Sequence, residues 1–255
     1  MDFQELLKIM ETLRSEKGCP WDKEQTRESL KPYIVEEAYE LIEAIDESDH
    51  EKIKEELGDL LFQIVFQCQL AKENNDFTIS DVIEKVSKKM ISRHPHVFGG
   101  ADYRTADEVL AHWEEQKKLE GKMRESILEG IPKTLPSLLR AHRLQKRAAG
   151  VGFDWEKVED VLMKLDEEMK EFREAFQTKK QGEMEEELGD MLFMLVNISR
   201  FIGVNPEDAL RKTIRKFISR FSFIETNAAK QGKKLSDMTL SEMDSLWDEA
   251  KGMGK

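Results

Sequence analysis

Two closely similar stretches, "KEELGDLLFQIVF" at Lys54–Phe66 and "EEELGDMLFMLVN" at Glu185–Asn197, each place acidic residues directly before an apolar run. Both contain EELGD, which starts at Glu55 and again 131 positions later at Glu186 (186 minus 55). A step from acids into an apolar run is typical of an amphipathic helix that packs on a core. Its repetition predicts that the chain is built from two related modules.

The duplication extends well beyond these two stretches. "EEAYEL" at Glu36–Leu41 corresponds to "EEMKEF" at Glu167–Phe172, again 131 positions apart (167 minus 36), so both acidic motifs keep their spacing in each copy. "KMISR" at Lys89–Arg93 corresponds to "KFISR" at Lys216–Arg220 with an offset of 127 (216 minus 89). We expect one module over residues 1–119, a second over 137–255, and a linker over 120–136 in which Gly130, Pro132 and Pro136 interrupt helical periodicity.

The composition favours helices. Hydrophobic residues make up 39% and charged residues 36% of the 255 positions, with only 14 Gly and 6 Pro, which suits long amphipathic helices better than strands and tight turns. Helical spacing of apolar residues predicts helices over 3–16, 30–47, 49–74, 78–94 and 106–119, the last bearing Trp113. Thr78 or Ser80 is the expected N-cap of the fourth helix. The predicted fold is all-α, with two tandem helical-bundle modules.

The charge and the apolar runs exclude some classes of partner. With 40 basic and 52 acidic residues the formal charge is −12, which disfavours binding to a nucleic-acid polymer but not to a small anion held by local cations. The N-terminus has no signal-peptide core, and the uncharged stretch Leu60–Ala71 is too short to cross a bilayer. Cys19 and Cys68 lack the spacing of a disulfide or zinc framework. We expect a cytoplasmic protein without a membrane partner.

Carboxylates are the strongest candidate site residues. In the second module Glu168 and Glu171 share one helix face, and Glu187 and Asp190 repeat that spacing on the next helix, which a short connection makes an antiparallel neighbour. Four converging acids repel one another unless a positive charge lies between them. A single acidic run is usually a solvated helix face, but equal spacing in both copies favours a metal site. Gly189, in a helix interior, is explained if the partner helix or a ligand approaches closely.

The donor set indicates the metal and the chemistry. All-oxygen ligands suit Mg²⁺ or Mn²⁺ better than zinc, and Mg²⁺ commonly shares its coordination shell with substrate phosphates. The geometry therefore favours cleavage of a phosphate ester or anhydride by a metal-activated water. The first module carries the equivalent metal ligands Glu37, Glu40, Glu56 and Asp59.

Basic and aromatic residues could bind the rest of such a substrate. Lys216 and Arg220 are four apart on a predicted helix and could hold phosphates, as could Lys89 and Arg93 in the first module. Salt bridges to surface acids are an equally open alternative for these cations. Trp247 could stack on a base, although a buried Trp is more common.

Several of these motifs together resemble one family. "CPWDKEQT", "EEAYEL", "EELGDLLFQIVF", "RHPHVFGG", "VGFDW" and "EEELGDMLFMLVN" are similar to the MazG nucleoside triphosphate pyrophosphohydrolases in their tandem form, over nearly the whole chain. The resemblance implies an all-α pyrophosphatase fold, a homodimer, and Mg²⁺-dependent conversion of NTPs and dNTPs, ATP included, to nucleoside monophosphate and pyrophosphate. Broad specificity and a house-cleaning role in the nucleotide pool are also implied.

The resemblance also assigns roles to residues of the second module. Magnesium would be bound by Glu168, Glu171, Glu187 and Asp190, with Glu167 supporting or activating the water. Lys216 and Arg220 would hold phosphates, with Trp247 near the base. Family members can carry a lysine just before the second acid motif, where Glu183 and Met184 stand here, so Lys179 or Lys180 would have to replace it.

The two copies are not equivalent. In tandem members of the family the C-terminal module is generally regarded as the main catalytic unit. Asn197 stands where the first module has Phe66, and an Asn past Asp190 could hydrogen-bond a ribose or a metal-bound water. Two other functions stay open at this point: a narrower dUTP, dCTP or phosphoribosyl-ATP pyrophosphohydrolase, and a non-catalytic nucleotide-sensing helical module.

Overall fold

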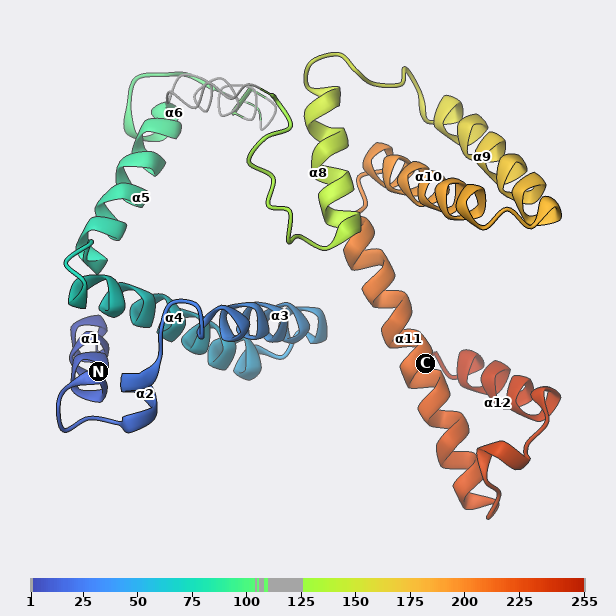
Figure 1. Cartoon of the computed structure of the whole chain (residues 1–255), viewed down its shortest axis with the longest axis horizontal. Coiled ribbons are helices and arrows are strands. Elements are labelled where there is room, and N and C mark those ends of the chain that lie inside the picture. Colours follow the sequence, from blue (N-terminus) through green and yellow to red (C-terminus); the bar gives the residue numbers. More distant parts are fainter. Residues whose placement is uncertain (1, 104, 106–107, 110–125, 255) are drawn as a thin grey trace. The chain divides into compact units, whose positions relative to one another are not determined.

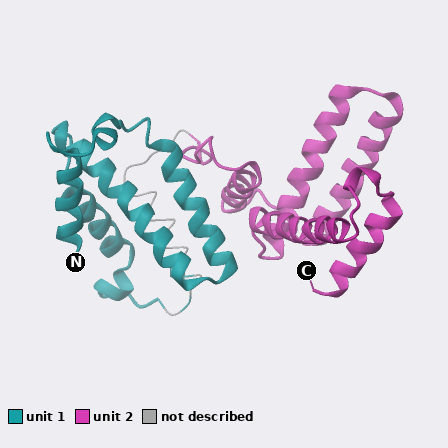
Figure 2. Cartoon of the chain, turned by 90° about the horizontal axis from the view of Figure 1, so that it is seen from below, with its two compact units in different colours: residues 1–122 teal, residues 123–255 magenta. Residues whose placement is uncertain are grey.

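The computed structural model describes residues 2–103, 105, 108–109 and 126–254. Every regular element in these parts is a helix, which confirms the all-α prediction. The chain divides into two compact units, residues 1–122 and 123–255 (Figure 2), and the division falls inside the predicted linker. The predicted helix over 106–119, with Trp113, lies outside the described residues except at 108–109. No helix in the described parts is long and apolar enough to cross a bilayer.

Unit 1 follows the predicted helix order, and local signals fix where its helices begin. Asp2 accepts a hydrogen bond from the backbone of Glu5 in a capping box, and Thr78, not Ser80, caps the fourth long helix in the same way. The helices are α1 (Phe3–Arg14), α2 (Pro20–Glu24), α3 (Lys31–Glu47), α4 (His50–Glu73), α5 (Ile79–Arg93) and α6 (Pro95–Phe98), as Figure 1 shows.

The core of unit 1 forms where α1 packs on the C-terminal half of α4. Phe66 is 1% exposed and meets the Phe62 ring edge to face at 6.1 Å. Tyr33 of α3 packs against the same cluster and also meets Trp21 at 5.9 Å. The buried members of the cluster are Met10, Leu30, Val65, Phe66 and Leu70.

Unit 2 repeats the helix pair and packs further helices around it. The α9 helix packs along α10, α8 packs on both α10 and α11, and α12 packs on α11 (Figure 1). The elements are α8 (Ser137–Ala149), α9 (Val158–Thr178), α10 (Gln181–Phe201), α11 (Pro206–Lys230), η1 (Leu235–Asp237) and α12 (Leu240–Gly252).

The same turn joins the paired helices in both units. Ser48 and Lys179, 131 positions apart (179 minus 48), end α3 and α9 in the left-handed conformation with φ of 58° and 56°. A two-residue connection of this kind reverses the chain, so each pair is antiparallel. The following residues differ, because Asp49 accepts hydrogen bonds from the first backbone N–H groups of α4, whereas Lys180 offers α10 no such side-chain cap.

Candidate metal centre

Carboxylates from α9 and α10 converge in unit 2. Glu168 and Glu171 of α9 and Glu187 of α10 each offer an oxygen that lies within 4.8 Å of the others. Glu168 is only 5% exposed, whereas Glu171 faces solvent. Asp190 follows Glu187 by three residues on α10, and its negative charge acts on the Glu187 carboxylate. The structure therefore brings together Glu168, Glu171 and Glu187 of the second module, while Asp190 lies outside this group of converging oxygens.

Unit 1 builds the same arrangement from α3 and α4. Oxygens of Glu37, Glu56 and Asp59 lie within 4.8 Å of one another. Glu40 belongs to the same group, since its charge acts on both Glu37 and Glu56. The two clusters thus match at two positions, Glu37 with Glu168 and Glu56 with Glu187, and differ in the third acid.

Burial and mutual repulsion make the ionised form of several of these carboxylates unfavourable. Desolvation, followed by the charges of Asp59, Glu40 and Glu56, raises the pKa of Glu37. Desolvation and nearby acids also raise the pKa of Glu56 in unit 1 and of Glu187 in unit 2. Desolvation and neighbouring negative charges both disfavour the ionised form of a carboxyl group, and a nearby cation favours it. This all-oxygen donor set of mutually repelling acids fits a hard divalent ion such as Mg²⁺ or Mn²⁺.

A lysine reaches the cluster of unit 2. Lys164 lies one turn before Glu168 on α9, and its Nζ atom is 2.8 Å from Glu168 Oε1 and 3.0 Å from Glu167 Oε1. Hydrogen bonds to these two carboxylates raise the pKa of Lys164 well above its usual value. The equivalent residue of unit 1 is Tyr33 (164 minus 131). Sequence reasoning missed Lys164, although its four-residue spacing from Glu168 was a usable signal.

The two helix-interior glycines do not mark a close helix contact. A Cβ atom added to Gly58 or Gly189 would have no described atom within 4 Å, apart from its own chain neighbours and helix backbone. The prediction that the partner helix approaches Gly189 is therefore wrong. The alternative, that a ligand approaches there, stays a prediction.

The basic and aromatic candidates of unit 2 form a second group on α11 and α12. The Arg220 guanidinium carbon lies 5.3 Å from the centre of the Trp247 ring, which also meets Phe217 at 5.4 Å. Lys216 is exposed on α11, one turn before Arg220. The structure thus gathers Arg220 and Trp247 on α11 and α12, while the carboxylates lie on α9 and α10. In unit 1, Lys89 is exposed on α5 and Arg93 is buried at the end of that helix.

Asn197 is engaged in a polar network inside unit 2. Its side chain is buried, and its Oδ1 atom accepts hydrogen bonds from Arg200 at 2.8 and 3.2 Å. Arg200 also donates to Asp154 Oδ2 at 2.9 Å, which ties the loop before α9 to α10. This network gives Asn197 a structural role, and its predicted contact with a ribose or metal-bound water stays a prediction.

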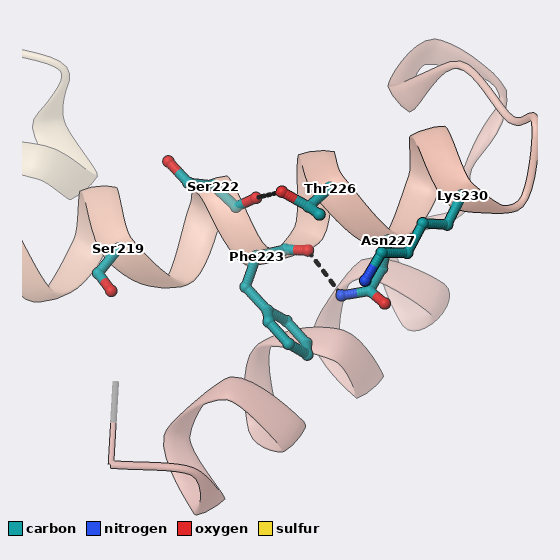
Figure 3. A pocket seen from close by; sticks show the side chains of 6 residues that line it. All are labelled: Ser219, Ser222, Phe223, Thr226, Asn227 and Lys230. Atoms are coloured by element: carbon teal, nitrogen blue, oxygen red, sulfur yellow. Dashed lines mark hydrogen bonds between the residues drawn. The ribbon is translucent and has the colours of Figure 1, made fainter.

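A shallow pocket on α11 lies apart from the carboxylates. It has a volume of about 340 Å³. Two of its polar side chains bond back to the helix, because Thr226 donates to the Ser222 carbonyl and Asn227 to the Phe223 carbonyl (Figure 3). No cluster acid belongs to its lining, which consists of Ser219, Ser222, Phe223, Thr226, Asn227 and Lys230. The pocket is therefore not the candidate metal centre.

Comparisons with known proteins match both helix pairs. A family model described as the MazG nucleotide pyrophosphohydrolase domain matches residues 25–98 and again 156–222, and the two matches start 131 positions apart (156 minus 25). A protein of Thermotoga maritima, named nucleoside triphosphate pyrophosphohydrolase/pyrophosphatase MazG, is 49% identical over 253 residues, 98% of this chain and 96% of that protein. The nucleoside triphosphate pyrophosphohydrolase of Escherichia coli K12 is 44% identical over 253 residues, 96% of this chain and 95% of that protein.

Proposed function

The chain belongs to the MazG family of nucleotide pyrophosphohydrolases, and on that premise we propose that it hydrolyses nucleoside triphosphates, NTPs and dNTPs alike, to nucleoside monophosphate and pyrophosphate. One observation carries the proposal. Each unit gathers three carboxylate ligand atoms within 4.8 Å of one another on a helix pair, and two of the three positions match between the units. Repelling acids kept together in this way are suited to a divalent cation that also binds phosphates. The role that follows is control of the nucleotide pool.

The carboxylates of unit 2 would hold the cation, which is Mg²⁺ with Mn²⁺ as a substitute. When bound, such an ion polarises phosphate oxygens and lowers the pKa of a coordinated water. Glu167, exposed beside Glu168, would accept the proton of the attacking water. The ligands would be Glu168, Glu171, Glu187 and Asp190.

The group on α11 and α12 would bind the nucleotide. Lys216 and Arg220 supply positive charge for the phosphates that the cation does not neutralise. Trp247 would stack on the base, and stacking does not read the hydrogen-bonding edge of a base. This supports broad specificity, because a base contact made by stacking tolerates every nucleobase.

An exposed apolar stripe supports a homodimer. Leu188, Leu192 and Leu195 are spaced along one face of α10 and are 46–49% exposed. An apolar face of this kind is suited to packing against another helix. Their counterparts on α4, each 131 positions earlier, are also exposed: Leu57, Leu61 and Ile64. Apolar stripes repeated in this way favour burial against a second copy of the chain. Light scattering at micromolar concentration should give the mass of a dimer, and a monomer would contradict this.

Product analysis tests the proposed reaction. The purified chain is incubated with Mg²⁺ and with dUTP or one of the eight common NTPs and dNTPs, and nucleotides, pyrophosphate and orthophosphate are quantified. We expect equal amounts of nucleoside monophosphate and pyrophosphate from most substrates, and no turnover when EDTA replaces Mg²⁺. Nucleoside diphosphate with orthophosphate would contradict the proposal. Turnover of dUTP or dCTP alone would contradict broad specificity but keep the reaction.

A matched pair of variants separates catalysis from a sensing role. Glu168→Gln removes a buried cluster charge, and Glu186→Gln removes an exposed charge from α10 outside the cluster. The first variant should lose turnover and the second should keep it. If neither the unchanged chain nor the Glu186→Gln variant releases pyrophosphate, the chain is a non-catalytic module.

A further inference from the structure

Lys164 distinguishes the two carboxylate clusters. In unit 2 its ammonium nitrogen lies 2.8 Å from Glu168 Oε1, on a carboxylate that is also a cluster ligand. In unit 1 the same position is Tyr33, whose ring packs on the core cluster and on Trp21. Glu37, the counterpart of Glu168, makes no ion pair with any lysine or arginine among the residues that the structure describes.

The Lys164 ion pair differs from an ordinary surface pair on the same helix. The side chain of Glu168 is 7% exposed and that of Lys164 is 31% exposed, so little water screens the two charges. Lys170 and Glu174, also four residues apart on α9, are 3.9 Å apart with side chains 77% and 65% exposed. Pairs of the latter kind contribute little to stability, whereas removing one partner of a buried pair leaves an uncompensated charge.

Lys164 and a divalent cation would compete for the same carboxylate, that of Glu168. The Oε1 atom of Glu168 that binds the ammonium belongs to the same carboxylate that lies within 4.8 Å of ligand oxygens from Glu171 and Glu187. A cation among these three acids would meet the positive charge of Lys164 at close range. Two positive charges so near each other repel unless the lysine side chain moves away.

We propose that Lys164 is an internal counter-ion of the unit 2 cluster, which stabilises the metal-free site and exchanges with the divalent cation when the cation binds. The proposal rests on the metal site of the proposed function. Among the described residues of unit 1 no lysine or arginine takes this place beside Glu37, where Tyr33 stands at the position of Lys164. The two sites would then differ in metal affinity even though their carboxylates match.

Metal titration of the full chain tests the exchange. Glu37→Gln and Glu56→Gln together silence the unit 1 site, and Mn²⁺ binding to unit 2 is measured by calorimetry in this background. Lys164→Met keeps the length and apolar stem of the side chain but removes its charge. We expect Mn²⁺ to bind about tenfold more tightly to this variant, the scale of one charge–charge interaction near a protein surface. Lys164→Arg, which keeps the charge, should restore the affinity of the background protein.

Thermal unfolding in EDTA provides a second readout that needs no metal. Lys164→Met should unfold at lower temperature than the background protein, and saturating Mn²⁺ should raise its midpoint by more than that of the background. Lys170→Met is the matched control on the same helix and should change neither the affinity nor the metal-dependent shift.

The possible outcomes separate this proposal from the proposed function. Unchanged or weaker Mn²⁺ binding in Lys164→Met would contradict the exchange while leaving the metal site intact. Failure of Mn²⁺ to bind even the background protein would contradict the metal site, and the exchange with it. An equal gain in affinity in Lys170→Met would show a general charge effect and would also overturn the exchange.

Discussion

The two units hold matching carboxylates in different surroundings. Both clusters sit on an antiparallel helix pair joined by the same left-handed turn, at Ser48 and Lys179. Around the unit 1 cluster the equivalent positions carry Tyr33 and Phe66, which pack in the core. In unit 2 the same positions carry Lys164 and Asn197, both engaged in polar contacts.

This difference separates two properties of the site. The helix pair and its turn place the acids, because Glu37 and Glu56 in unit 1 and their counterparts Glu168 and Glu187 in unit 2 converge in the same way. The neighbouring residues set the charge balance, because Lys164 lies against Glu168 in unit 2, whereas Tyr33 stands at that position in unit 1. A duplicated site can therefore keep its ligands while its metal affinity and activity diverge.

Placing each residue at the other's position, as Phe66→Asn and Asn197→Phe, should reduce the free energy of unfolding more strongly for the change in unit 1. Phe66→Asn removes a ring that is 1% exposed and buries an amide in its place, so we expect a loss of about 3–5 kcal/mol in the free energy of unfolding. Asn197→Phe deprives Arg200 of an acceptor but leaves its bond to Asp154, with an expected loss of about 1–3 kcal/mol. Urea denaturation followed by circular dichroism measures both. A larger loss for Asn197→Phe would contradict this account of the two cores.

Lowering the pH should weaken metal binding more steeply in unit 1. A raised carboxyl pKa means that the proton returns at a higher pH, so as pH falls through the raised value the cation must displace protons. The pKa is raised for both Glu37 and Glu56 in unit 1 and for Glu187 in unit 2, where the Lys164 ammonium also lies against Glu168. Each proton displaced weakens binding by up to about tenfold per pH unit.

The pH comparison requires each site alone in the full chain. Mn²⁺ affinity between pH 7.5 and 5.5 is measured in the Glu37→Gln/Glu56→Gln variant for unit 2, and in the Glu168→Gln/Glu187→Gln variant for unit 1. Equal slopes in the two variants would show that the neighbouring residues do not set the charge balance.

The residue that follows each turn, Asp49 or Lys180, should have the smallest effect on stability. Asp49→Ala removes hydrogen bonds to the backbone of Glu51 and Lys52 and should cost about 1 kcal/mol in the free energy of unfolding. Lys180→Ala removes no cap and only an exposed pair with Glu183, so a loss of about 0–0.5 kcal/mol is expected. Urea denaturation of both variants checks the difference. Equal losses would mean that the Asp49 cap does not stabilise the start of α4.

The sequence predicted the helices and the converging acids because both follow from local periodicity and from repeated spacing. The same spacing of acids in two copies is not expected from a solvated helix face, so the sequence alone assigned Glu168 and Glu187 to one site. The all-α fold followed from the helical spacing of apolar residues, and the structure confirms it.

Other features depend on contacts that spacing does not encode. The link from Asn197 through Arg200 to Asp154 joins residues more than forty positions apart, so sequence reasoning treated Asn197 as a candidate ligand for substrate. Gly189 suggested a close helix contact, but the space beside it is open, because helix propensity does not show what lies next to a helix. Lys164 is one charge among many in the sequence, and only the fold shows its ammonium against a buried carboxylate.

We propose that the cluster of unit 2 is the main catalytic centre. Pyrophosphate release at saturating Mg²⁺ and nucleoside triphosphate tests it in Glu187→Gln and Glu56→Gln, with the exposed neighbours Glu186→Gln and Glu55→Gln as matched controls. We predict that Glu187→Gln lowers kcat by about 100-fold or more, the scale of losing a group that stabilises transition-state charge, while Glu56→Gln changes it by less than about twofold. Equal losses in the two variants, or a larger loss in Glu56→Gln, would contradict the claim.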